Sequence, residues 1–400
     1  MKNHPRYRRI VLQMLHLGLV FALVSQFGKM QNNGGIPARM SKYPASRIQQ
    51  STEERFDNKT ITEPTRKGSI AFLFMTSRGL DDDLWKRWFP PQNDTRYSIF
   101  VHSVPSNTTV PLGPFFCQYV IPSVPTGWFV LHNGMMQVLQ HAYHQDKQAQ
   151  QFVFVSETSI PLVSFDEAYR RLIGEGETIQ KSKFCLGQTE DFWDLPAAVL
   201  KVESNVTRKG EMWSSLSRTH TSLILKHRQE LDEWNRVFLD ITYDKRRRKR
   251  IGAPDECLFP TFLNRLIGDS QFESCEKKMS NCCTTMVVWH MQSQKVVLND
   301  TIVLSDMCHG FPCTFPSLRE EGLHYLADDG YVFLRKVPRH AIIQGSHGML
   351  YNLTDVLHYV HQGLPISDFD KHRQAGTSTP ASIIASTFEC PAPVEGNRSI

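Results

Sequence analysis

The sequence lacks the glycine-rich motifs that hold nucleotide phosphates on backbone N–H groups. No G-x-G-x-x-G follows any predicted strand, and no G-x-x-x-x-G-K-S/T occurs in the 400 residues, which disfavours dinucleotide-binding and P-loop proteins. The C-x2-C spacing of a zinc ribbon is also missing. A large excess of one charge is absent too, because 45 Lys and Arg face 40 Asp and Glu, for a net charge of +5. Charge alone therefore indicates no class of partner.

An apolar run follows a basic cluster at the N-terminus. Four basic residues among the first nine precede residues 10–27. At 1.5 Å per residue this run reaches roughly 27 Å, the thickness of a thin hydrocarbon core. We expect residues 1–9 to be a cytoplasmic tail and residues 10–27 a transmembrane signal anchor of type II orientation. A cleaved signal peptide is the alternative, but Ala22-Leu23-Val24 lacks a small residue next to the cut.

Sequons and cysteines behind this anchor indicate the lumen of the secretory pathway. Seven N-x-S/T sequons occur, at Asn58, Asn93, Asn107, Asn205, Asn299, Asn352 and Asn397. The nine cysteines are expected to form structural disulfides with one left over, and their connectivity is not set by the sequence. The alternative is a zinc site from Cys308, His309 and Cys313 with the Cys282-Cys283 pair.

The composition divides the remaining chain into three parts. Residues 28–66 are rich in Ser, Pro and charge with little apolar periodicity, and are expected to be a stem. Residues 67–340 turn apolar and aromatic, with enough length for one large domain. Residues 341–400 are expected to be a largely flexible C-terminal extension. It contains one possible last helix at Leu353–Leu357.

Within the domain, short apolar runs alternate with helical patterns. Residues 69–75, 97–102 and 151–156 predict buried strands, because they are too continuously apolar to have a face in water. Residues 131–145 carry apolar side chains at helical spacing, and Ser164 to Glu167 is a capping box that opens another helix. This alternation predicts an α/β fold with a parallel or mixed sheet, whose ligands bind at the carboxyl ends of the strands.

Two groups of carboxylates are candidates for chemistry. Asp255 and Glu256 follow Pro254 at the mouth of an apolar helix, where the helix dipole favours ionised carboxylates and makes Glu256 a ready base. The alternative is that both acids only complement the dipole. Glu157 directly follows the predicted strand at 151–156, which places a carboxylate at the carboxyl edge of the sheet.

Here a resemblance to a known family appears. Residues 152–162 resemble the F-V-x-x-S-E-x-x-I-P-L segment of the core-2/I-branching β-1,6-N-acetylglucosaminyltransferase family, in its plant-type branch. Further blocks recur in the family's order at residues 71–76, 84–85, 88–89, 97–103, 208–210, 213, 254–256 and 333–336. The resemblance covers about residues 68–338, and its strength lies in the order and spacing of the blocks.

The resemblance implies an inverting enzyme with a variant GT-A fold and a mixed, mostly parallel sheet. Such enzymes are Golgi membrane proteins, single-pass type II, with a lumenal catalytic domain, here residues 67–340. They move a sugar from a UDP-sugar co-substrate to a hydroxyl of a glycan or glycoprotein acceptor. Glu256 matches the family's base, and Lys336 the lysine that meets the diphosphate, with Arg335 alongside. A second family arginine lacks a clear counterpart, Arg319 being the nearest candidate.

Because basic side chains would neutralise the diphosphate, no metal ion or other cofactor is expected. Asp81-Asp82-Asp83 imitates the D-x-D motif of metal-dependent glycosyltransferases, but its position before an apolar segment predicts the cap and first turn of a helix. Glu157, a single carboxylate, is a poor site for a divalent ion. We expect it to accept hydrogen bonds from hydroxyls of the donor sugar or acceptor, the alternative being a turn cap.

Aromatic side chains are candidates for the acceptor site. Trp289 matches a family tryptophan on that side, while Trp213 and Trp128 are weaker candidates, because a tryptophan is more often part of a core. Asp255 is assigned to the acceptor side with them. The expected sugar is N-acetylglucosamine in β-1,6 linkage. Because other relatives move glucuronic acid or xylose, these two sugars are alternatives for the transferred sugar.

Two other classes of protein are open. A catalytically silent glycan-binding relative would keep the fold without needing Glu256 and Lys336 together. A nucleic-acid-binding protein would use the six consecutive cations at residues 245–250, but the anchor and sequons argue against a nucleic-acid partner. In the lumen this run would be a solvated loop, a docking site for an acidic acceptor, or a cleavage site for a proprotein convertase.

Overall fold

The computed structural model describes residues 68–104, 112–127, 130–174, 181–186, 207–241, 243–244, 249–250, 253–268, 273–276, 283–289, 295–299, 301–310 and 312–374. All of them belong to one unit of the chain, Glu63–Ile400. The predicted tail, anchor and stem lie outside the described residues. Within the described ranges, no helix combines the length and hydropathy needed to cross a membrane.

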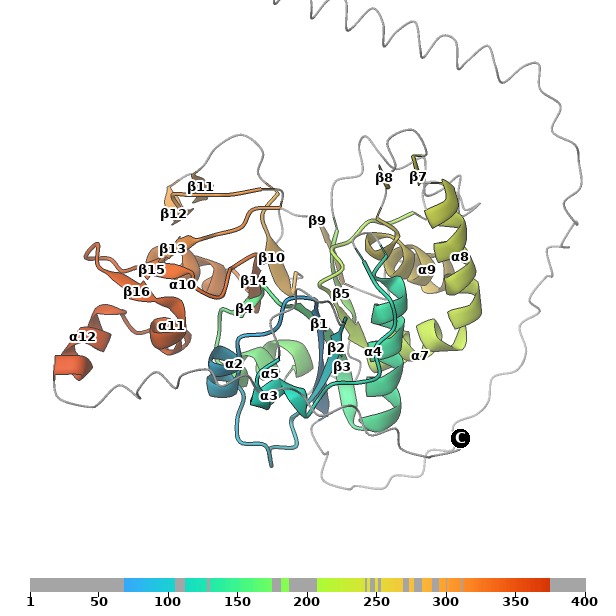
Figure 1. The fold of residues 1–400 in the computed structure, drawn as a ribbon, viewed down its shortest axis with the longest axis horizontal. Coiled ribbons are helices and arrows are strands. Elements are labelled where there is room, and N and C mark those ends of the chain that lie inside the picture. The colour runs from blue at the N-terminus through green and yellow to red at the C-terminus, as the bar shows by residue number, and fades with distance from the viewer. Residues whose placement is uncertain are drawn as a thin grey trace, which may run out of the picture. The chain divides into compact units, whose positions relative to one another are not determined.

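The three predicted strands pair in parallel and make up one half of a six-stranded mixed sheet (Figure 1). The strand order is β2-β1-β3-β6-β5-β9. The strands are β1 (Ser69–Thr76), β2 (Tyr97–Ser103), β3 (Ala149–Ser156), β5 (Lys183–Leu186), β6 (Ser215–Ser217) and β9 (Glu273–Glu276). β6 runs antiparallel to both β3 and β5. The predicted mixed α/β fold is therefore confirmed.

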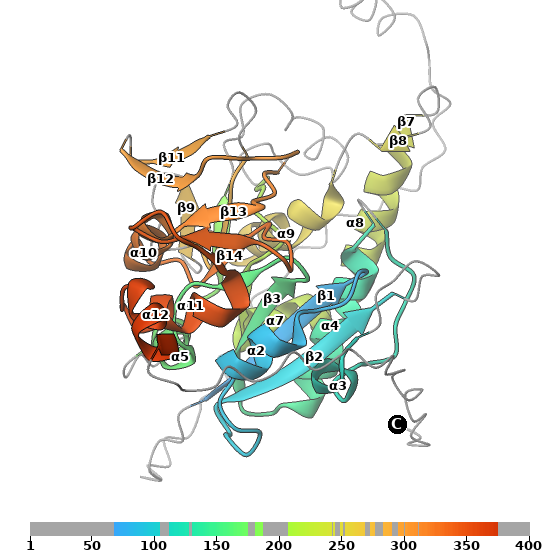
Figure 2. The same cartoon turned by 60° about the vertical axis from the view of Figure 1, so that its left-hand side comes forward.

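The apolar runs are continuous because both faces of β1 are covered. Phe72 and Phe74 point into one core cluster, whereas Leu73 and Met75 point into the other. Helices α2 (Asp82–Trp88) and α5 (Phe165–Ile173) supply the first cluster, and α4 (His132–Gln145) and α7 (Arg218–Lys226) the second (Figure 2). With helices on both faces, the free surfaces of the strands are their ends, where a site can form.

The remaining helices complete these layers. They are α3 (Pro114–Cys117), α8 (Arg228–Ile241), α9 (Leu258–Ile267), α10 (Glu320–Asp328), α11 (Leu353–His361) and α12 (Ser367–Gln374), with a 3-10 turn at Pro254–Glu256. The hydroxyl of Ser164 accepts from the Glu167 N–H at 3.3 Å, as the capping box predicted. Asp81 caps α2 by accepting from the Leu84 N–H at 3.2 Å. The interpretation of Asp81 to Asp83 as the cap and first turn of a helix is therefore confirmed.

Smaller sheets lie beside the central one. They are β10 (Thr285–Val287) with β14 (Phe333–Arg335) and β4 (Ile160–Pro161), β11 (Val296–Leu298) with β12 (Ile302–Ser305), β13 (Ser317–Arg319) with β15 (Ile342–Gln344) and β16 (Leu350–Asn352), and β7 (Tyr243–Asp244) with β8 (Lys249–Arg250). Leu334 of β14 pairs with Ile160 of β4, and the Val337 N–H donates to the Thr158 carbonyl at 2.8 Å. β14 is thereby held against the segment that follows β3.

The folded domain continues past the predicted boundary at residue 340. β15, β16, α11 and α12 follow it, and Ile343, Val356 and Leu357 are buried in the core. The expectation of a largely flexible extension is therefore corrected for residues 341–374. The predicted helix at Leu353–Leu357 exists as α11, but α12 follows it.

The cysteines form bridges where the structure describes both partners. Cys185 is bonded to Cys283, and Cys308 to Cys313. These bonds use three of the sulfurs of the alternative zinc site, so the prediction of disulfides is supported. Among the described residues the free cysteine is the buried Cys257.

The sequons that the structure describes lie on the surface, and the described part of the basic run at residues 245–250 lies in a short strand. Asn93, Asn299 and Asn352 are exposed, as a glycan would require. The other four sequons fall outside the described residues, as do residues 245–248 of the basic run. The last two residues of that run form β8.

Candidate active site

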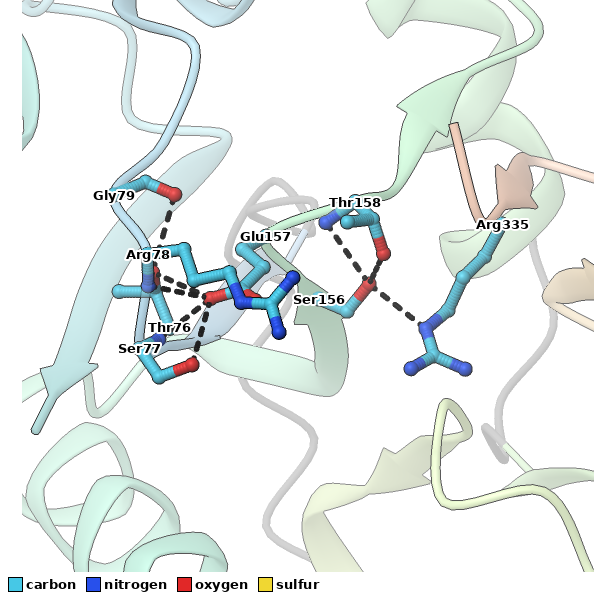
Figure 3. A network of polar contacts seen from close by, with 8 residues as sticks. All are labelled: Thr76, Ser77, Arg78, Gly79, Ser156, Glu157, Thr158 and Arg335. Atoms are coloured by element: carbon cyan, nitrogen blue, oxygen red, sulfur yellow. Dashed lines mark hydrogen bonds and ion pairs between the residues drawn. The ribbon is translucent and has the colours of Figure 1, made fainter. Parts of the chain in front are cut away.

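The candidate site begins where β1 and β3 end. Glu157, the first residue after β3, reaches across to the loop that follows β1 (Figure 3). Its Oε2 accepts from the N–H groups of Ser77 and Arg78 at 2.5 and 2.8 Å and from the Thr76 hydroxyl at 3.0 Å. The carboxylate thus fixes the backbone of the neighbouring loop. The carboxylate caps the loop after β1 rather than Glu157's own turn. The expected hydrogen bonds to hydroxyls of the donor sugar or acceptor stay a prediction.

Arg335 lies on the other side of Ser156 (Figure 3). Its Nε donates to the Ser156 hydroxyl at 3.0 Å, and its guanidinium lies over the Trp213 ring, 4.5 Å from the centroid. Burial lowers the Arg335 pKa to about 10, against the opposing effect of three acids, Glu211, Glu157 and Glu256. Arg335 is therefore a buried cation facing the site's carboxylates, and the buried Trp213 is better placed to hold it than to meet a sugar.

Lys336 follows Arg335 at the end of β14 and is only partly buried. Its N–H donates to the Cys313 carbonyl, and its own carbonyl accepts from the Phe315 N–H at 2.8 Å, which fixes its backbone. Burial lowers the Lys336 pKa, and the charges of Arg335 and Arg78 lower it further, while Glu157 raises it. Lys336 is thus a lysine in a positively charged surrounding, suited to an anion.

Glu256 lies at the end of the 3-10 turn that precedes α9, with 15 % of its side chain exposed. Its Oε2 is 3.1 Å from the Lys209 Nζ, which lies 5.8 Å from the centroid of the Trp289 ring. The predicted base and the predicted aromatic residue are therefore joined by one lysine. The roles of Glu256 as base and of Trp289 at the acceptor stay predictions, for which this shared lysine supplies a common location.

The segment Thr207–Trp213, here called the strap, ties these groups together. The Gly210 N–H donates to the Glu256 carbonyl at 2.8 Å. The Arg208 N–H donates to the Thr261 hydroxyl of α9 at 2.9 Å, and that hydroxyl donates back to the Arg208 carbonyl. Buried Glu211 accepts from the indole Nε1 of Trp289. The strap thus positions the base and the tryptophan relative to each other.

Asp255 differs from its neighbour. It is buried, and its Oδ1 has no hydrogen-bond partner among the described residues. Burial, with a further contribution from Glu256, raises the Asp255 pKa to about 7. The expectation that both acids stand ionised at a helix start therefore needs correction for Asp255, because removal from water outweighs the favourable dipole.

The structure brings most of the predicted residues to this one region. Arg319 is not among the residues that these contacts join. Its ion pairs are with Asp306 and Glu321. Trp128 lies outside the described residues. Among the groups that sequence reasoning had not assigned are Arg78 and Glu211. The available signals were a cation two residues after the first strand and an acid between the family blocks at 208–210 and 213.

Comparison with known proteins identifies the family. The family model of the Core-2/I-Branching enzyme matches residues 70–309, more than half of the chain. The chain belongs to the Core-2/I-Branching enzyme family. It is also 28 % identical over 180 residues to "Glycosyltransferase BC10" of Oryza sativa subsp. japonica, a match that covers 43 % of this chain and 44 % of the relative. The chain therefore spans less than half of that relative's length.

The family match covers part of the candidate site. The matched stretch contains Glu157, the strap, Glu256 and Trp289, whereas Arg335 and Lys336 follow it. The family match therefore does not assign Arg335 and Lys336 to the site. Their assignment rests on the contacts that hold β14 against β4 and against the residues after β3.

Proposed function

We propose that the protein is an inverting UDP-sugar-dependent glycosyltransferase of the Golgi, anchored as a type II membrane protein. It transfers a sugar to a hydroxyl of a glycan or glycoprotein acceptor. The proposed sugar is N-acetylglucosamine in β-1,6 linkage, and glucuronic acid or xylose is the alternative. The printed name of the rice relative, a glycosyltransferase, supports the reaction class.

One observation carries this proposal. A partly exposed carboxylate, Glu256, lies in the same site as the cations at the end of β14, and Arg335 is influenced electrostatically by Glu256 as well as by Glu157. Transfer needs a base for the attacking hydroxyl and positive charge for the departing diphosphate. The two requirements are met by different elements, the 3-10 turn before α9 and the end of β14.

The proposed reaction is a single displacement. The acceptor oxygen forms a bond to the anomeric carbon, while the bond from that carbon to the diphosphate oxygen breaks and its electron pair leaves with UDP. Glu256 takes the proton of the attacking hydroxyl, and one carboxylate is enough because no glycosyl-enzyme intermediate forms. Lys336 and Arg335 stabilise the charge that collects on the diphosphate. Trp289 presents its ring to the acceptor.

Glu256→Gln tests the proposed base. The amide keeps the shape of the side chain but cannot accept the proton, so turnover should fall by about 10²–10⁴ while the Kd for UDP hardly changes. Rates are measured at saturating donor and acceptor, and UDP binding by calorimetry. Glu233→Gln is the matched control, because Glu233 is an exposed acid on α8 that pairs with Arg236, and it should leave turnover unchanged.

Two outcomes would contradict parts of the proposal. Near wild-type turnover of Glu256→Gln would move the base elsewhere. A wild-type protein that binds acceptor glycan but transfers no sugar from any UDP-sugar would instead be a silent glycan-binding relative. Screening the purified full chain for hydrolysis of UDP-N-acetylglucosamine, UDP-glucuronic acid and UDP-xylose identifies the donor.

A further inference from the structure

The loop that follows β1 is fixed at its backbone. Glu157 accepts hydrogen bonds from the N–H groups of Ser77 and Arg78, and the Thr76 hydroxyl donates to both Glu157 and the Gly79 carbonyl. Gly79 has a φ of 83°, in the left-handed region that glycine tolerates. These bonds from four consecutive residues place the Arg78 Cα at a defined point on the carboxyl edge of the sheet.

The Arg78 side chain, by contrast, is open to solvent. It is 84 % exposed, and its contact with Glu157 is a single Nε to Oε1 distance of 4.0 Å. An exposed ion pair of this length stabilises a protein by little. Oε1 is also the carboxylate oxygen that does not accept from the loop backbone. The guanidinium can therefore leave Glu157 without disturbing the hydrogen bonds that fix the loop.

The surroundings of Arg78 have an excess of positive charge. Arg335 and Lys336 lie at the end of β14, and Arg78 is near enough to Lys336 to contribute to the lowering of its pKa. Three cations thus share the region with Glu157, whose Oε2 already accepts from the loop. Like charges held together in this way favour an anion that carries more than one negative charge.

We propose that Arg78 is a second donor-binding cation, whose guanidinium moves from Glu157 onto the diphosphate of the UDP-sugar on the side opposite Lys336. This inference rests on the proposed function. A guanidinium can donate two parallel hydrogen bonds to phosphate oxygens, which an ammonium cannot. Arg78 would then fill the role for which the sequence offered only Arg319, which forms ion pairs with Asp306 and Glu321.

Calorimetric titration of the full chain with UDP, inorganic pyrophosphate and uridine tests this role. Arg78→Ala should weaken UDP and pyrophosphate about tenfold, the loss expected for one charge-assisted contact, and leave uridine binding unchanged. Arg78→Lys should recover part of the affinity. Arg87→Ala is the matched control, since Arg87 is an exposed arginine on α2 that pairs with Asp355, and it should bind all three ligands as the wild type does.

The outcomes separate this inference from the proposed function. If the wild type binds UDP and Arg78→Ala binds it equally well, Arg78 does not contact the diphosphate, and the proposed reaction is unaffected. If Arg78→Ala weakens uridine as much as UDP, the loop shapes the nucleoside site instead, and the inference is overturned. If the wild type binds neither UDP nor pyrophosphate, the proposed function itself fails. Thermal unfolding should be unchanged in Arg78→Ala, because the side chain is exposed.

Discussion

At the scale of single residues, the three candidate carboxylates have different environments. Glu157 is held by backbone N–H groups, Glu256 is paired with Lys209, and Asp255 is buried. The chemistry available to each follows from these surroundings. Glu256 is partly exposed and therefore reachable, whereas burial favours the protonated form of Asp255.

Asp255 should make the stability of the protein depend on pH. Its pKa is raised from 3.8 to about 7 in the folded state, so between these values the native state binds more protons than the unfolded state. The free energy of unfolding should therefore fall as the pH rises through this window, by on the order of a few kcal/mol. Asp255→Asn should flatten this slope, measured by urea unfolding from pH 4 to 8. Parallel curves for variant and wild type would show that Asp255 does not titrate there.

Lys336→Ala should weaken UDP binding and turnover together. The lost charge-assisted contact corresponds to about 1.5–3 kcal/mol, or roughly ten- to a hundredfold or somewhat more in affinity. If cations alone neutralise the diphosphate, wild-type turnover should also survive EDTA. Loss of activity in EDTA with rescue by Mn²⁺ would contradict this prediction and call for carboxylate ligands. Lys371→Ala, which removes an exposed lysine of α12 paired with Asp368, serves as the control.

At the scale of elements, α11 should be part of the cooperative fold. Leu357 is buried in the core, whereas Leu364, in the turn after α11, is 40 % exposed. Leu357→Ala should lower the free energy of unfolding by about 2–5 kcal/mol, because it removes transfer energy and leaves a cavity. Leu364→Ala should change it by less than about 0.5 kcal/mol. Equal, small effects in denaturant unfolding would mean that residues after 340 are not required by the domain.

At the scale of the whole molecule, the predicted topology places residues 1–9 in the cytoplasm and the folded domain in the lumen. Protease added to sealed microsomes should then leave the bulk of the chain intact, and an N-glycanase should increase its gel mobility. Asn93, Asn299 and Asn352 are exposed, so replacing each Asn by Gln should remove one glycan where the site is used. Complete digestion, or a chain without glycans, would contradict the lumenal assignment.

The sequence by itself determined the local features of this protein. The apolar runs gave β1, β2 and β3 because a strand buried on both faces must be continuously apolar, and the Ser164 capping box predicted the start of α5 because its hydrogen bond spans three residues. The order of the family blocks identified the family and placed Glu256 and Lys336 among the candidates.

Only the tertiary structure decided how these residues meet. The ion pair of Lys209 with Glu256 and the contact of Arg78 with Glu157 join residues 47 and 79 positions apart (256 − 209 and 157 − 78), which no local pattern encodes. The burial of Asp255 and of residues in α11 likewise depends on elements that pack from elsewhere in the chain. A site of this kind is set by where strands end in space, since parallel strands bring distant segments to one edge of a sheet.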